Sequence, residues 1–158
     1  MAAPFLPAGL GSVGAEALPA KTLTVEEANR LLPSIEAIFQ EMDRRSIRLR
    51  EVLELITDLE EYWGVRVGDL DLPDRAMHLG LLGERDDLQA SLHDSIERIQ
   101  ASGAVLKDYQ QGLVDFYGLV DGRLAFLCWQ RGEPAVRFYH PLEGGFAGRR
   151  PLTSIAQK

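Results

Sequence analysis

IEAIFQEMDRRSIRLREVLELITDLEEYW, residues 35–63, is the segment around which the rest of the chain is organised. Its apolar residues recur at alternating intervals of three and four, which is typical of a long helix with a coiled-coil seam. The seam consists of Ile35, Ile38, Met42, Leu49, Val52, Ile56, Leu59 and Trp63. Phe39, Leu53 and Leu55 widen it, so we expect this helix to bury a broad stripe against more than one neighbour.

Arg45 interrupts the seam at a position where an apolar residue is due. A buried guanidinium without a partner is too costly to keep. We therefore expect Arg45 to meet an acid from a second helix or from another chain, or to extend into solvent. Basic residues gather at 44–50 and acidic residues at 54–61, which is usual for a solvated helix face but would also let two copies pair antiparallel.

The helix boundaries can be read from capping residues. Thr24 followed by Glu27 forms a capping box and predicts a helix start, while Pro33 predicts a kink or a separate short helix before the long one. The long helix should end near Gly64. A second periodic segment predicts a helix over residues 73–102, and the connecting loop of about ten residues makes the pair an antiparallel hairpin.

The periodicity changes after Gly103. Three short segments, 113–117, 124–129 and 136–140, are rich in aromatic and β-branched residues. Turn residues separate them, first at Asp121-Gly122 and then at Gly132-Glu133-Pro134, so they predict a three-stranded antiparallel meander. Residues 105–109 could add an edge strand. We therefore expect an α+β fold, in which a long antiparallel helical hairpin at about 24–103 packs on a small C-terminal β cassette at about 104–152.

Residues 1–20 differ from the rest of the chain and are interpreted as an apolar, flexible N-terminal arm on a single domain over 21–158. The arm lacks the basic start of a secretory signal, and its prolines and glycines exclude a membrane-spanning helix. Phe5, Leu6 and Leu10 are apolar for a solvated tail, so the alternative is an arm that orders on a partner.

Composition narrows the classes of function. The net charge of −7 argues against general binding to nucleic acid, and acidity most often reflects solubility alone. Cys128 is the only cysteine, so neither an intramolecular disulfide nor a cysteine metal cluster can form, which fits the reducing cytoplasm.

Several separated motifs occur in an order that resembles a known family. They are Glu26-Glu27-Ala28-Asn29, Leu31-Leu32-Pro33, Gly112-Leu113-Val114-Asp115-Phe116, Leu127-Cys128-Trp129, Gly132-Glu133, and His140 with the glycine-rich stretch 144–149. Together they resemble the bacterial domain-of-unknown-function family twenty-two-zero-three over about residues 23–152. The resemblance implies no activity, because the family has no assigned function. Tyr139 stands where the family often has tryptophan.

The β cassette holds the candidate site. If Asp115, Glu133 and His140 converge, two carboxylates and an imidazole can bind a divalent metal ion or perform acid–base chemistry. The alternative is that each has a structural partner, for example Glu133 with Arg131 or Arg149. Cys128 is interpreted as a buried, inert thiol. Strand alternation places Phe126 and Cys128 on one face and Leu127 and Trp129 on the other. Both faces are apolar, so the sheet is covered on both sides or meets a partner.

These observations favour a non-enzymatic interaction protein, a scaffold or accessory subunit of a larger bacterial assembly that binds a protein partner or forms a homo-oligomer. The expected interaction residues are Phe5, Leu6, Leu10, Arg45, Trp129 and Arg149. The alternative is a metal- or anion-binding enzyme with its site in the β cassette. No catalytic residues and no cofactor are expected in the first interpretation.

Deleting residues 1–20 should leave the thermal stability of the protein nearly unchanged, because a flexible tail contributes no core contacts. The measurement is a thermal melt of the truncated and full-length chains followed by circular dichroism. A truncated chain that unfolds, or loses several kcal/mol of stability, would show that the segment belongs to the core.

Overall fold

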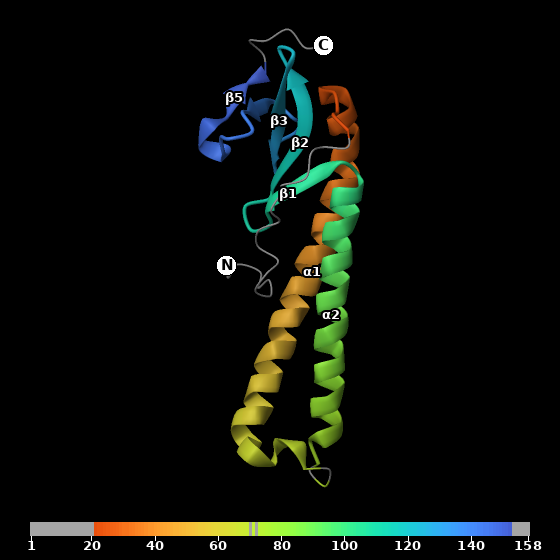
Figure 1. The fold of residues 1–158 in the computed structure, drawn as a ribbon. Coiled ribbons are helices and arrows are strands. Elements are labelled where there is room, and N and C mark those ends of the chain that lie inside the picture. Colours follow the sequence, from red (N-terminus) through yellow and green to blue (C-terminus); the bar gives the residue numbers. More distant parts are fainter. Residues whose placement is uncertain (1–20, 70, 72, 153–158) are drawn as a thin grey trace.

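The computed structural model describes residues 21–69, 71 and 73–152, so the apolar arm at 1–20 lies outside the described residues. Over the described part, two helices are followed by one five-stranded sheet, an α+β arrangement (Figure 1). The elements are α1 (Val25–Trp63), η1 (Gly64–Gly68), α2 (Arg75–Ala101), β1 (Ala104–Asp108), β2 (Leu113–Val120), β3 (Arg123–Gln130), β4 (Phe138–His140), η2 (Phe146–Gly148) and β5 (Arg150–Pro151).

Helix α1 begins at the predicted capping box. The Glu27 amide donates to Thr24 Oγ1 and the Thr24 amide donates to Glu27 Oε1, both at 3.1 Å. The helix then continues through Pro33, so the separate short helix that Pro33 suggested does not form. Leu32 and Ile35, on either side of the proline, are both buried in the main core, and this packing holds the helix together where a backbone hydrogen bond is missing.

The buried polar residue in the apolar seam of α1 is Ser46 and not Arg45. Ser46 is fully buried, whereas the Arg45 side chain keeps 38% of its surface exposed. Arg45 Nη1 lies 3.5 Å from Glu41 Oε2 and donates to Ser95 Oγ of α2 at 3.4 Å. The acid that meets Arg45 therefore comes from the same helix, while the small Ser46 side chain is buried next to the Tyr109 hydroxyl.

Helix α1 ends at Gly64, which has a φ of +57°, and the chain reverses through η1 into α2. At this tip, Trp63 Nε1 donates to Asp74 Oδ2 at 2.9 Å, which ties the end of one helix to the start of the next. Helix α2 is unbroken at Gly80 and Gly83. The two helices form the expected hairpin, seen as two near-parallel columns in Figure 1.

The sheet has five antiparallel strands in the order β1-β2-β3-β4-β5, so the prediction of three strands was too small. Strand β1 forms at the edge position suggested by residues 105–109. Strand β5 has only two residues and contains Pro151, so it carries no alternating pattern from which it could be predicted. Asp121 and Gly122 both have positive φ, as a two-residue type I′ hairpin between β2 and β3 requires.

The two faces of the sheet have different covers. Ala125, Leu127 and Trp129 belong to the core that β3 shares with the helices. Phe126 and Cys128 point to the other face and are also buried, at 4% and 2% exposure. Around Cys128 that face is covered by the segment 144–146 of the same chain. The apolar pattern on both faces therefore reflects a sheet that is covered on both sides here.

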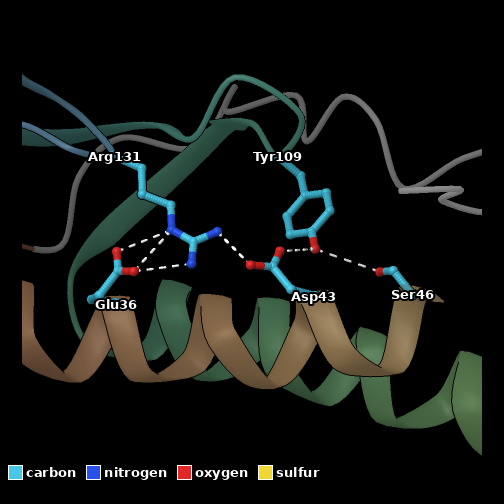
Figure 2. A network of polar contacts seen from close by, with 5 residues as sticks. All are labelled: Glu36, Asp43, Ser46, Tyr109 and Arg131. Carbon is cyan, nitrogen blue, oxygen red and sulfur yellow. Dashed lines mark hydrogen bonds and ion pairs between the residues drawn. The ribbon is translucent and has the colours of Figure 1, made fainter. Parts of the chain in front are cut away.

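A polar clamp joins the sheet to α1 (Figure 2). Arg131, just after β3, donates to Glu36 at 3.0 Å and to Asp43 at 2.7 Å. Tyr109, just after β1, donates to Asp43 Oδ1 at 2.7 Å, and its hydroxyl lies 3.5 Å from that of Ser46. Burial raises the pKa of Tyr109, so its hydroxyl still donates at alkaline pH values where an exposed tyrosine ionises. These contacts set the position of the sheet along the helix.

The sheet covers only the half of the hairpin that includes the start of α1 and the end of α2 (Figure 1). We call residues 47–91 the projecting arm. The α1 part of this arm is about 25 Å long at 1.5 Å per residue. Leu49 of this arm still belongs to the main core, and Val52, Ile56 and Leu81 form a small separate cluster of buried apolar residues. Neither helix in the described part of the chain combines the length and the apolar composition needed to cross a membrane.

Replacing Tyr109 by Phe should cost about 1–2 kcal/mol of stability, because it removes a hydrogen bond to a charged, half-buried carboxylate and leaves the ring packing intact. The measurement is the free energy of unfolding from urea denaturation. Tyr62→Phe is the matched control, since Tyr62 is 78% exposed and its variant should stay within about 0.5 kcal/mol of the original protein. Equal losses in both variants would show that the clamp contributes nothing.

Candidate functional site

Asp115, Cys128 and His140 meet on the face of the sheet that points away from the helices. They come from three adjacent strands, β2, β3 and β4. Asp115 is directly opposite Cys128 in the β2–β3 register, and His140 is opposite Phe126, two residues from Cys128 on the same face. One potential ligand atom from each residue lies within 4.8 Å of the other two, and all three residues are buried. We call these three residues the sheet-face cluster.

His140 is held by two acceptors. Its Nε2 lies 2.8 Å from Asp115 Oδ2, and its Nδ1 lies 2.8 Å from the backbone oxygen of Pro141. Because a carbonyl oxygen can only accept, the hydrogen on Nδ1 must point to Pro141. A proton must then lie between Nε2 and Oδ2, whether it belongs to an imidazolium or to a carboxylic acid. The ring is therefore fixed with Nε2 directed into the cluster.

Burial dominates the electrostatics of the cluster. It raises the pKa of Asp115 above its ordinary value, against the opposing effect of the charge and hydrogen bond of His140. Burial and the nearby Asp115 carboxylate raise the pKa of the Cys128 thiol to about 12. A nucleophilic cysteine needs the opposite change and a base to take its proton. His140 Nε2 is engaged by Asp115, so the arrangement does not support cysteine catalysis.

A cavity of about 180 Å³ adjoins the sheet-face cluster. Its wall includes the three cluster residues, Lys107, Leu113 and the segment 144–146. The Lys107 ammonium lies 4.3 Å from the centre of the Phe126 ring, so its charge is directed over an aromatic face at the rim. The cavity could hold a small ligand or water next to the three polar side chains.

Glu133, predicted as the third ligand, lies outside this cluster. Its carboxylate accepts from Arg149 Nη2 at 2.6 Å and from the Gln130 amide at 2.5 Å, so it closes the turn after β3. This is one of the two structural partners that the sequence suggested for Glu133. The expected pair of carboxylates is thereby replaced by one carboxylate and one thiol, because Cys128 stands directly opposite Asp115.

Two expected interaction residues are engaged within the chain. Trp129 is 3% exposed, lies 6.4 Å from Phe39 by ring centroids, and donates from Nε1 to the Glu133 oxygen at 2.9 Å. The Arg149 guanidinium lies over the rings of Phe138 and Phe146, at 4.1 and 4.7 Å from their centres. Arg45 is the most exposed of these three, while Phe5, Leu6 and Leu10 lie outside the described residues.

The role of Cys128 in the cluster was missed by sequence reasoning, although a signal for it exists. A two-residue turn at Asp121-Gly122 fixes which residues of the flanking strands are opposite one another. Counting outward from that turn pairs Asp115 with Cys128, as the structure shows. The position of His140 could not be counted in the same way, because the β3–β4 connection is longer and irregular.

Cys128 should resist a thiol reagent such as Ellman's reagent at about pH 8 in the folded protein, because it is buried and its pKa is about 12. The reaction should reach one equivalent only when urea unfolds the chain, and its midpoint should coincide with that of the unfolding curve. Rapid labelling of the native protein would show that the thiol is accessible.

Comparison with known proteins gives one match. The profile of a family described as uncharacterized conserved protein (DUF2203) matches residues 21–152, which cover both helices and all five strands. No curated protein and no solved structure matches the chain significantly. The matched range also contains the sheet-face cluster and agrees with the resemblance seen in the separated motifs. The chain therefore belongs to the DUF2203 family of uncharacterized conserved proteins.

Proposed function

We propose that this protein is a non-enzymatic accessory subunit that binds another protein through its projecting arm. The observation that carries the proposal is the arm itself, which extends past the sheet (Figure 1). The arm also combines exposed apolar side chains with an excess of acidic residues. Among the buried residues of α1, Leu49 is the last that belongs to the core shared with the sheet, whereas the helix continues to Trp63.

Several large apolar side chains of the arm are exposed. Ile47, Leu55 and Tyr62 are 60%, 42% and 78% exposed and are spaced by eight and seven residues, so they lie on one side of α1. Val65 and Met77 add exposed apolar surface near the tip. Apolar residues that gather on one side of an element are typical of a surface that binds a partner.

The charge of the arm selects the kind of partner. Residues 47–91 contain five arginines and eleven carboxylates, a net charge of −6. Arg48 is already paired with Glu84 at 2.6 Å and with Glu51 at 3.2 Å. Two such arms would repel each other, which disfavours antiparallel pairing of two copies. A different protein with a basic, apolar-lined surface is the complementary partner.

A surface groove of about 380 Å³ on the same helix supports this choice. Its lining combines an apolar floor with acids and one arginine: Arg50, Leu53, Glu54, Thr57 and Asp58. A lysine or arginine from a partner could lay its aliphatic stem on Leu53 and direct its charge to Glu54 or Asp58. The groove and the stripe of Ile47, Leu55 and Tyr62 would then form one interface.

The test is a comparison of variants in affinity isolation from the native host. The double variant Leu55→Ser/Tyr62→Ser should recover about tenfold less of a specific partner than the original chain, a loss of about 1.4 kcal/mol. Recovery of the partner should also fall when the salt concentration is raised, because salt screens the attraction between an acidic arm and a basic partner. It should fall for the same reason in the double variant Glu54→Lys/Asp58→Lys, which reverses two of the acidic charges.

The matched control is Leu119→Ser/Leu142→Ser, which changes two apolar residues of similar exposure, 54% and 41%, on the β cassette. It should recover the partner as the original chain does. Light scattering should report a monomer of the isolated chain. Partner recovery that is unaffected by the arm variants, or lost equally in the control, would contradict the proposal.

A further inference from the structure

The sheet-face cluster brings an oxygen, a nitrogen and a sulfur ligand atom together from Asp115, His140 and Cys128. We propose that these residues bind a divalent transition metal ion of the zinc class. Zinc is bound in proteins by thiolate, imidazole and carboxylate ligands, whereas magnesium and calcium prefer six or more oxygens. This site is separate from the projecting arm and does not depend on the function proposed for it.

The orientation of His140 fits metal ligation. A histidine that binds a metal through one ring nitrogen commonly donates from the other to a backbone carbonyl or a carboxylate. His140 Nδ1 lies 2.8 Å from the Pro141 oxygen, which leaves Nε2 directed at the cluster. In the metal-bound form the ion takes the place of the proton between Nε2 and Asp115 Oδ2.

The distances require only small movements. Zinc bond lengths of about 2.0–2.3 Å place tetrahedral ligand atoms about 3.3–3.6 Å apart. Asp115 Oδ2 and His140 Nε2 are 2.8 Å apart and must separate slightly, while no pair of ligand atoms in the cluster exceeds 4.8 Å. Side-chain rotations can supply these changes, because the three residues stand on adjacent, hydrogen-bonded strands.

The charges also match. An Asp115 carboxylate and a Cys128 thiolate together balance a divalent ion, and metal coordination deprotonates a thiol even when burial disfavours the free thiolate. Lys107 lines the same cavity and carries a charge that opposes the ion. Lys107→Met should therefore bind the metal at least as tightly as the original chain.

The cavity leaves room for a fourth ligand. Three protein ligands with one open position are typical of catalytic zinc sites, and structural sites are closed by a fourth side chain. The 180 Å³ cavity beside Gly144 and Gly145 can hold a water or a small anionic group at that position. A side chain at Gly144 would bring its Cβ within 3.4 Å of the Pro141 ring and narrow the cavity.

The experiment uses the full-length chain, freed of metal by a chelator and titrated with Co²⁺ and then Zn²⁺. One equivalent of Co²⁺ should produce visible bands of a four-coordinate ion and a thiolate charge-transfer band in the near ultraviolet, and Zn²⁺ should displace it. Zinc should also raise the melting temperature, because it binds the folded state alone.

Cys128→Ser keeps the volume of the side chain and should abolish the charge-transfer band. His140→Gln should weaken Co²⁺ binding by about 100-fold or more, since even outer partners of a ligand contribute 10–100-fold. His93→Gln is the matched control, because His93 is an exposed histidine on α2 and its loss should change nothing. Absence of the bands in the original chain, a band that persists in Cys128→Ser, or binding lost in His93→Gln would overturn the proposal.

Discussion

The seating of the sheet on α1 around Phe39 is the contact on which the rest of the structure depends. Phe39 is fully buried, its ring stacks on Tyr109 at 5.9 Å, and the Arg131 guanidinium lies 5.2 Å from its centre. The clamp of Arg131 and Tyr109 on Glu36 and Asp43 then sets the position of the sheet along the helix. A sheet whose edge strands have only two and three residues would not be stable alone. The helical hairpin also needs this contact, because helices in proteins are stabilised mainly by tertiary packing and only weakly by the helix propensity of their residues.

This seating creates two separate surfaces. Because Leu49 is the last buried α1 residue of the main core, the sheet leaves the hairpin beyond it uncovered within the described part of the chain, and this part forms the projecting arm. Because the helices take one face of the sheet, the other face must be covered by the chain that follows β4. That cover is glycine-rich and leaves a cavity beside Asp115, Cys128 and His140. The packing of the sheet on α1 therefore determines the positions of both the proposed partner surface and the proposed metal site.

Sequence signals predicted the structure correctly where the interactions involve only neighbouring residues. The capping box at Thr24, the end of α1 at Gly64 and the turn at Asp121-Gly122 each depend on a few neighbouring residues, and each was predicted. Pro33 was expected to produce a kink or a separate short helix, but α1 is one helix through Pro33, because burial of Leu32 and Ile35 outweighs the missing hydrogen bond. Glu133 was placed in the candidate site because its distance from Arg149 cannot be inferred from the chain order.

The sequence by itself determined the α+β class and the helical hairpin, because periodicity and caps are encoded within short segments. The two-residue turn at Asp121-Gly122 also encodes the pairing of Asp115 with Cys128, which sequence reasoning missed. Only the tertiary structure decided that Ser46 rather than Arg45 faces the seam, that β5 completes a fifth strand, and that His140 reaches Asp115 while Glu133 does not. The first outcome depends on which side of α1 packs against Tyr109, and the other two depend on how the irregular connection after β3 returns across the sheet. The course of this connection is set by packing between residues that are distant in the sequence, so it cannot be predicted from a local sequence pattern.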